Sequence, residues 1–134
     1  MIPRTMKAVL LKGHGGLEQL EYRDDVPVPT PAAGEVLVKV GAAAVNNTDI
    51  NTRIGWYSKS VATATADAVA QTASEATDGG WAGNPFIFPR IQGTDVCGRI
   101  VAVGAGVAEA RIGQRVIVDP VLRPADGSLA DVGY

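Results

Sequence analysis

PRIQGTDVCGRIVAVGAGVAEARIGQRVIV, residues 89–118, carries the strongest structural signal in this chain. Two runs within it, 99–103 and 115–118, are rich in β-branched residues and are bounded by glycine. Short apolar runs of this kind are typical of buried strands rather than helices. Glycines also separate the two runs, and glycine adopts the positive φ of a tight turn without steric cost. The stretch therefore predicts a strand, a turn and a second strand.

Three side chains near the start of the first run are of chemical interest. Thr94 and Asp95 stand just before it, at a place where binding and catalytic groups are common. Cys97 is the only cysteine, so an internal disulfide and a multi-cysteine zinc knuckle are both excluded. Arg99 is its one evident cationic neighbour, and we therefore predict that Cys97 is packed rather than reactive.

Upstream, the segments 6–12, 17–23 and 36–40 are predicted to be strands, because each is a short run between turn-forming residues. Residues 13–16 (GHGG) would make the turn between the first two. The proline-rich segment 26–31 must be extended, since proline fixes its own φ and restricts the residue before it. The chain is therefore predicted to be mostly β, a small, partly open barrel with short helices.

The segment NNTDINTRIGWY, residues 46–57, follows the third of these strands. Asn, Thr and Asp are preferred at helix starts, so we expect a turn or two of helix that stops at Gly55. Residues 58–84 are rich in Ala, Thr and Ser and are predicted to be an inserted, partly helical or mobile loop. Residues 119–134 are broken by proline and glycine and show no clear partner.

Composition excludes several classes of function. The 134 residues suit one domain, and a net charge of −2 gives no reason to expect a nucleic-acid or membrane partner. No apolar run approaches the roughly 18–20 residues of a membrane span, and residues 1–6 lack the apolar core of a signal peptide. The single histidine, His14, lies in a glycine turn and is predicted to be a surface residue. We expect a cytoplasmic protein.

Two interpretations of residues 46–57 follow from the residues alone. Polar side chains at the end of a buried strand could hydrogen-bond the carbonyl oxygen of a substrate. Alternatively, the segment is a helix N-cap with an exposed turn, in which Asp49 and Arg53 form an i,i+4 pair worth only a few tenths of a kcal/mol. The second interpretation is favoured on composition, because caps are far commoner than sites.

A longer pattern runs through the same region: Pro-x3-Gly-x-Asp-x2-Gly-x2-Val-x-Val-Gly over residues 89–104, followed by Gly-x-Arg-Val at 113–116. This pattern resembles the GroES-like domain of the medium-chain dehydrogenases/reductases. The resemblance covers residues 6 to about 118 and implies a GroES-like, partly open β-barrel with 58–84 as an insertion. In this family a Rossmann domain follows the barrel.

Zinc-dependent members of this family hold their metal with two motifs that are changed here. Where they have Cys-His-Ser/Thr-Asp, this chain has Asn46-Asn47-Thr48-Asp49, and where they have Gly-His-Glu it has Gly93-Thr94-Asp95. Zinc needs thiolate, imidazole or carboxylate ligands, commonly three from the protein at a catalytic site. Asp95 alone cannot hold it, and the four-cysteine lobe of structural zinc is also missing. We therefore expect no metal at this site.

The chain is more similar to the zinc-independent quinone oxidoreductase branch. That branch reads Val-Asn-x-x-Asp and then Arg-x-Gly-x-Tyr, matched here by Val45, Asn46, Asp49, Arg53, Gly55 and Tyr57. The resemblance implies hydride transfer from NADPH to a small-molecule quinone, enone or other carbonyl acceptor, with this domain on the substrate side of the cleft. It also implies that the Rossmann domain binds most of the NADPH, and that the full-length parent is a homodimer.

Asn46, Thr48 and Tyr57 are the catalytic candidates. Without a metal, the acceptor must be polarised by preorganised hydrogen bonds, which Asn46 and Tyr57 would supply. A hydroxyl at the place of Thr48 relays a proton in the zinc-containing relatives. Asn46 and Arg53 are the cofactor-binding candidates, with Arg53 meeting a phosphate. Pairing of Arg53 with Asp49 is the alternative.

We assign residues 1–134 to one GroES-like domain that is truncated before the Rossmann domain. Such a fragment is expected to be inactive alone.

Gly104-Ala-Gly106 is not a dinucleotide-binding motif, because Glu109 stands at the third glycine and residues 107–112 are too short for a crossover helix. The alternative is a free-standing GroES-like module that binds a ligand or partner without catalysis.

Overall fold

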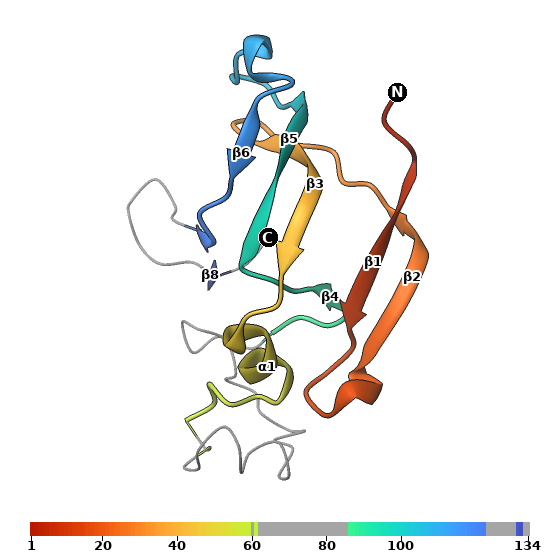
Figure 1. The fold of residues 1–134 in the computed structure, drawn as a ribbon, viewed down its shortest axis with the longest axis vertical. Helices are drawn as coiled ribbons and strands as arrows, with labels where there is room; N and C mark the ends of the chain where they lie inside the picture. Colours follow the sequence, from red (N-terminus) through yellow and green to blue (C-terminus); the bar gives the residue numbers. More distant parts are fainter. Residues whose placement is uncertain (60, 62–85, 123–130, 133–134) are drawn as a thin grey trace.

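Two three-stranded antiparallel sheets, with the orders β2-β1-β4 and β3-β5-β6, make up most of the fold. The structure is a computed structural model that describes residues 1–59, 61, 86–122 and 131–132. Its strands are β1 (Thr5–Leu11), β2 (Leu20–Pro27), β3 (Val36–Ala44), β4 (Arg90–Ile91), β5 (Asp95–Val103), β6 (Arg115–Ile117), β7 (Val121–Leu122) and β8 (Asp131–Val132). Figure 1 shows the two sheets side by side, with β4 running from the foot of one toward the other.

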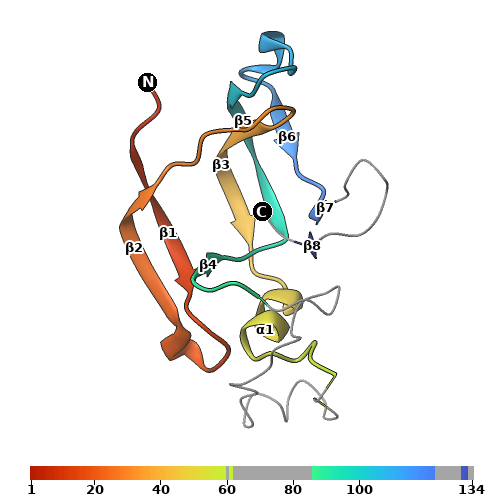
Figure 2. The same ribbon diagram turned by 180° about the vertical axis from the view of Figure 1, so that it is seen from behind.

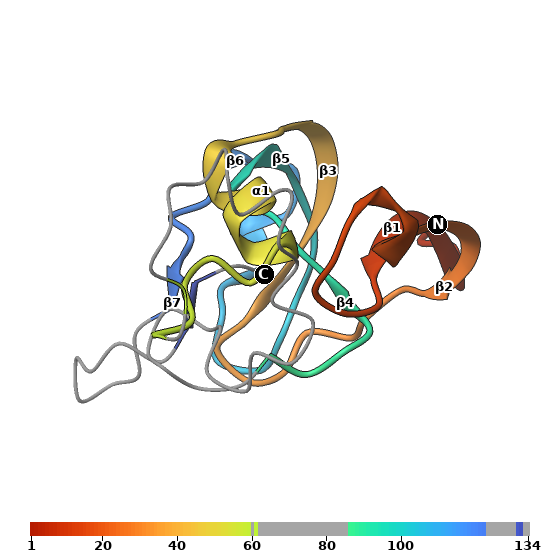
Figure 3. The ribbon, with the colours of Figure 1, turned by 90° about the horizontal axis from the view of Figure 1, so that it is seen from below.

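The two sheets do not close into a continuous barrel. Seen from below in Figure 3, β1 and β2 form a ribbon beside the curved β3-β5-β6 sheet. The prediction of a mostly β, partly open barrel is therefore confirmed.

β5 is the central strand of the second sheet. It pairs with β3 over its length, beginning with Asp95 opposite Ala44, and with β6 on its other side. The predicted strands 99–103 and 115–118 are thus present as β5 and β6, although β5 starts earlier than predicted and β6 ends at Ile117. Asp95 is the first residue of the strand rather than a residue before it, because β3 continues through its alanines to Ala44 and supplies backbone partners for that extension.

Two glycines of β5 and its turn stand where backbones come very close. A Cβ on Gly98 would lie 2.2 Å from the carbonyl oxygen of Lys39, so no side chain fits there between β5 and β3. Gly104 donates its N–H to the carbonyl of Glu35 at 2.8 Å. Gly106 has a φ of 83°, as predicted for the turn.

The connection from β5 to β6 is short and returns antiparallel. It contains the 3-10 helix η2 (Glu109–Arg111), and the N–H of Gly113 donates to the carbonyl of Ile100 at 2.8 Å. No crossover helix lies in this described segment, which agrees with the rejection of a dinucleotide-binding motif at Gly104.

The first sheet departs from prediction at its turn. The predicted strand 6–12 is present as β1, but residues Leu17–Gln19 form a 3-10 helix, η1, and β2 starts only at Leu20. The N–H of Gln19 donates to the carbonyl of Gly16 at 3.2 Å, and its carbonyl accepts from Lys12 at 2.9 Å. These two bonds close the turn locally, which is why the strand is delayed.

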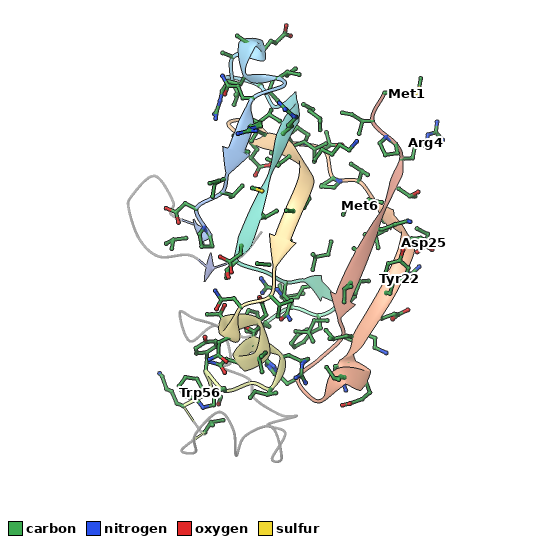
Figure 4. All side chains as sticks on the ribbon, in the orientation of Figure 1. Met1, Arg4, Met6, Tyr22, Asp25 and Trp56 are labelled. Atoms are coloured by element: carbon green, nitrogen blue, oxygen red, sulfur yellow. The ribbon has the colours of Figure 1, made fainter. Side chains whose placement is uncertain are left out.

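β2 carries an exposed ion pair on the outer edge of the molecule. The Nη2 atom of Arg23 lies 2.7 Å from Oδ2 of Asp25, and Figure 4 shows Asp25 and the neighbouring Tyr22 at this edge. The hydrogen bond from Arg23 lowers the pKa of Asp25. Both side chains are solvated, so the pair contributes little to stability.

The helix α1 (Asn47–Arg53) lies below the β3-β5-β6 sheet (Figures 1 and 3), and its last residue accepts from the N–H of Gly15 in the turn between β1 and β2 at 2.8 Å. The N–H of Ile54 donates to Ile50, and Gly55 follows with a φ of 71°, so the helix ends where it is predicted to end. The buried hydrophobic core of the described residues is small and consists of Leu11, Ile54 and Ile100. Leu11 belongs to β1 and Ile100 to β5, and Ile54 is the C-cap residue of α1.

The end of the described chain corrects another prediction. Figure 2 shows β7 and β8 beyond β6, and Val121 pairs with Val132 in an antiparallel register. The expectation that 119–134 has no clear partner is therefore wrong, because two-residue strands are too short to produce a recognisable pattern.

The predicted insertion, 58–84, lies almost wholly outside the described residues. None of the described helices is long and apolar enough to cross a membrane.

Candidate active site

Asn46 caps the N-terminus of α1. Its backbone is extended, with φ −114° and ψ 161°. Its Oδ1 accepts from the N–H of Thr48 at 3.2 Å, and its own N–H donates to Oδ2 of Asp49 at 2.6 Å. This reciprocal arrangement is a capping box, which satisfies N–H groups that a helix start leaves unpaired. The N-cap predicted from the sequence is present.

The amide nitrogen of Asn46 reaches the second sheet. Its Nδ2 donates to Oδ2 of Asp95, the first residue of β5, at 2.9 Å. The partners determine the orientation of the amide, because the backbone N–H of Thr48 can only donate and an ionised carboxylate can only accept. A primary amide nitrogen carries two hydrogens, so the bond to Asp95 uses only one of the two N–H groups of Asn46.

Two threonines extend this arrangement. The hydroxyl of Thr94 donates to Oδ2 of Asp95 at 3.3 Å, and Oγ1 of Thr48 lies 3.3 Å from Oγ1 of Thr94. Asn46 and Asp95 are exposed, whereas the threonines are half-buried. These four residues, Asn46, Thr48, Thr94 and Asp95, form one hydrogen-bonded group, which we call the polar cluster.

Gln92 fastens the helix to the segment between β4 and β5. Its Nε2 donates to the backbone carbonyl of Asp49 at 3.3 Å. Its Oε1 is buried without a hydrogen-bond partner among the described residues. Gln92 was not singled out from the sequence, and its only signal is a polar side chain just before Gly93.

Tyr57 and Arg53 lie at the other end of α1 from the polar cluster. Seven residues of helix span about 10 Å at 1.5 Å each. Tyr57 is half-buried, with its ring 5.6 Å from that of Trp56 in an edge-to-face arrangement, and Figure 4 shows Trp56 below the helix. Of the three predicted catalytic residues, the structure brings Asn46 and Thr48 together and places Tyr57 apart from them.

Arg53 is a buried residue that binds the glycine turn. Its Nη1 donates to the carbonyl of Gly15, whose N–H in turn donates to the carbonyl of Arg53 at 2.8 Å. Its relative exposure is only 9%. The guanidinium is thus directed at the β1–β2 turn rather than at Asp49, whose carboxylate accepts from Asn46. This geometry favours a structural role over contact with a cofactor phosphate.

His14 corrects a further prediction, because it is buried rather than on the surface. Its relative exposure is 6%. Its Nδ1–H donates to the carbonyl of Thr52 at 2.9 Å, and its ring meets those of Phe86 and Phe88 edge-on, with centroids 5.9 and 5.1 Å away. The turn is covered by aromatic residues more than 70 positions along the chain, and a local pattern cannot reveal this.

Glu18 lies in the same turn and is exposed. Hydrogen bonds from the backbone N–H groups of Glu18 itself and of Gly16 lower its pKa, and the charge of Arg53 adds a smaller effect in the same direction. The turn therefore combines a buried guanidinium with a carboxylate that keeps its charge.

The polar cluster lacks the donor set of a metal site. An amide, two hydroxyls and one carboxylate replace the thiolates and imidazoles that zinc prefers. Among the residues that the structure describes, no group of three or more His, Cys, Asp or Glu side chains is close enough together to hold a metal ion.

Asn46→Ala is expected to lower the free energy of unfolding by about 1–2 kcal/mol, because it removes both the cap and the bond to Asp95. The exposed neighbour Asn47→Ala is the matched control and should stay within about 0.5 kcal/mol of wild type. Urea unfolding followed by circular dichroism would measure both. Equal losses in the two variants would contradict the cap.

Residues 32–131 match the family model of the alcohol dehydrogenase GroES-like domain. The match extends over most of the chain, and the chain therefore belongs to this family. It is an N-terminal GroES-like domain of the medium-chain dehydrogenase/reductase type, which confirms the resemblance drawn from residues 89–116.

Comparison with curated relatives shows which members of the family this chain is similar to. The starvation-sensing protein RspB of Escherichia coli K12 is 34% identical over 118 residues, which is 87% of this chain and 26% of that protein. Rat quinone oxidoreductase is 32% identical over 113 residues (84% and 27%). The chloroplastic NADPH-dependent alkenal/one oxidoreductase of Arabidopsis thaliana is 29% identical over 126 residues (94% and 26%). The chain thus spans about a quarter of the length of these relatives, and its family is one of oxidoreductases.

Solved structures agree. A solved structure of an alcohol dehydrogenase-type protein from Sinorhizobium meliloti 1021 is 51% identical in sequence to this chain and has a TM-score of 0.74. The match covers 99% of this chain and 34% of that protein. The alcohol dehydrogenase RspB of E. coli CFT073, complexed with NADH, is 30% identical, with coverages of 90% and 26% and a TM-score of 0.60.

Proposed function

We propose that this chain is the substrate-side domain of an NADPH-dependent oxidoreductase that transfers a hydride to a quinone, enone or other carbonyl acceptor without zinc. The observation that carries this proposal is the polar cluster. It joins the two motifs that hold zinc in metal-dependent members of the family, and it joins them by hydrogen bonds between side chains. The relatives named as quinone and alkenal/one oxidoreductases support the class of acceptor.

In this proposal Asn46 binds the oxygen of the acceptor. Its Nδ2 carries a second N–H besides the one that donates to Asp95, and the bonds to Asp95 and Thr48 hold the amide before the acceptor arrives. A donor that is already in place stabilises developing negative charge without the cost of reorganisation. Thr48 supplies a hydroxyl beside it, and Tyr57, beyond the other end of α1, is proposed as a second donor to the acceptor. Bound NADPH would supply the hydride.

The described residues offer no evident phosphate site. Arg53, the candidate for that contact, is buried and donates to Gly15. We therefore propose that a Rossmann domain elsewhere in the complete gene product holds most of the dinucleotide. In that arrangement residues 1–134 form the GroES-like domain, 58–84 is an insertion into it, and the complete protein is a homodimer.

The complete gene product is expected to oxidise NADPH when a quinone, an enone or an aldehyde is added, and to contain less than stoichiometric zinc. Loss of nicotinamide absorbance and elemental analysis would measure these two properties. A chelator should leave the rate unchanged, because no metal takes part. Stoichiometric zinc with chelator-sensitive activity, or no oxidation with any acceptor, would refute the proposal. Size-exclusion chromatography showing a heptamer would favour a binding module instead.

A further inference from the structure

We propose that Thr94 and Asp95 complete a proton relay that begins at Thr48 and ends in solvent. This inference rests on the proposed function, because a proton must reach or leave the acceptor's oxygen when its carbon gains or loses a hydride. The sequence marks both as polar residues near the start of a strand, but it gives neither of them a catalytic role. The structure links both residues to Thr48 through hydrogen bonds.

The geometry of the relay is continuous. Oγ1 of Thr48 lies 3.3 Å from Oγ1 of Thr94, which lies 3.3 Å from Oδ2 of Asp95. The two hydroxyls are half-buried and the carboxylate is exposed, so the path ends at solvent. Asn46 holds the end of the path in place, since its Nδ2 donates to the same carboxylate oxygen at 2.9 Å.

The protonation of Asp95 sets the direction of every hydrogen bond in this path. An ionised carboxylate only accepts, so Thr94 gives its single hydrogen to Asp95 and must accept from Thr48. Thr48 then presents lone pairs, which suit a ligand hydroxyl such as that of an alcohol or hydroquinone. When Asp95 is protonated the order reverses, and Thr48 presents its hydrogen, which suits a carbonyl oxygen.

The proton balance of reduction follows from this order. As the carbonyl carbon gains a hydride, the electron pair of the C–O π bond moves to oxygen, which takes the proton of Thr48. Thr48 takes the proton of Thr94, and Thr94 takes that of Asp95. The carboxylate that remains is reprotonated by water. Oxidation of an alcohol runs the same steps in reverse, with the proton delivered to Asp95 while the nicotinamide dinucleotide gains the hydride.

A purely structural tie between α1 and β5 would look similar in a single structure. The two roles differ in what a substitution at Thr94 should do. Thr94→Val keeps the shape but breaks the relay, whereas Thr94→Ser keeps the hydroxyl. A relay predicts that serine preserves turnover and valine does not, while a structural tie predicts that the two variants differ only in stability.

The experiment uses the complete gene product with the best acceptor from the panel. Thr94→Val is expected to lower kcat about 100-fold, the usual contribution of general acid–base catalysis, with KM within about threefold of wild type. Thr94→Ser should stay within about threefold in both. Asp95→Asn should lower kcat similarly, because a side-chain amide cannot pass on a proton as a carboxyl group does. Melting temperatures by circular dichroism would show that each variant is folded.

A second measurement needs no cofactor. Calorimetric titration with benzyl alcohol and benzaldehyde gives the ratio of affinities for a hydroxyl and a carbonyl ligand. Asp95→Asn is expected to lower the preference for the hydroxyl several-fold, because the amide no longer fixes the polarity of Thr94. A folded Thr94→Val enzyme with wild-type kcat, or an unchanged ratio in Asp95→Asn, would overturn the relay. A wild-type enzyme without activity would instead refute the function on which the relay depends.

Discussion

Replacing Gly104 by alanine is expected to lower the free energy of unfolding by about 4 kcal/mol or more, at the severe end of single substitutions. A Cβ at this position would lie 1.7 Å from the carbonyl oxygen of Ala32 and 3.2 Å from that of Pro31. Both atoms belong to the backbone and cannot rotate away as a side chain can. Moving the carbonyl of Ala32 would break the bond that it accepts from the N–H of Glu35, 3.1 Å long. Domains are typically stable by only about 5–15 kcal/mol.

Gly106→Ala separates this close approach from the conformational freedom of glycine. Gly106 has a φ of 83°, and no described heavy atom beyond its immediate chain neighbours lies within 4 Å of the Cβ position. Its replacement should cost about 1–2 kcal/mol, the usual cost of the left-handed conformation. Urea unfolding of both variants in the complete gene product, followed by circular dichroism, is the measurement. A Gly104→Ala midpoint no lower than that of Gly106→Ala would show that the backbones are not in contact.

The close approach at Gly104 marks the limit of sequence reasoning about the fold. The β-branched runs of β5 and β6 and the glycines after them predict strands and a turn, because those signals are local. The same reasoning finds α1, since Asn46 caps it and Gly55 ends it. What it does not show is that Gly104 packs on residues 31–32, because no pattern within a short window encodes that contact.

The sequence also predicts only part of the polar cluster. Its helix half, Asn46 and Thr48, could be chosen from the sequence, because cap residues and the resemblance both point to them. Asp95 was recognised as standing at a former ligand position, but its bond to Asn46 joins residues 49 positions apart. The pairing of the two motifs follows only when α1 is placed under the start of β5. Composition favours the cap, and the structure shows that the side chain of Asn46 caps α1 and also donates to Asp95.

Residues around the glycine turn show why exposure was the least predictable property. His14 and Arg53 are polar, and each sits beside glycine or a helix end, so both were expected to be solvated or to face a ligand. In the structure both are buried. Arg53 donates to the carbonyl of Gly15 in the glycine turn, and His14 donates to the carbonyl of Thr52 in α1. Buried polar groups are tolerated when hydrogen-bonded, and here the backbone supplies the partners.

Ile54→Ala is expected to lower the free energy of unfolding by about 3 kcal/mol, within the range measured for buried isoleucine and leucine. Ile54 is only 1% exposed and closes the C-terminus of α1 through its N–H bond to Ile50 at 3.0 Å. The alanine leaves a cavity where the helix meets the core. Because the same helix carries Asn46 and Thr48 at its other end, the loss of packing should also reduce turnover of the complete enzyme.

Two control variants make this expectation specific. Ile54→Val removes one methylene from the same site and should cost about 1 kcal/mol, whereas Ile87→Ala acts at a side chain that is 84% exposed and should cost no more than about 0.5 kcal/mol. Urea unfolding ranks the three, and the kcat of each folded variant shows whether the order is repeated in turnover. If Ile54→Ala is as mild as Ile87→Ala, Ile54 does not anchor the helix, and the position of the polar cluster must depend on the hydrogen bonds of Gln92 and Asp95 instead.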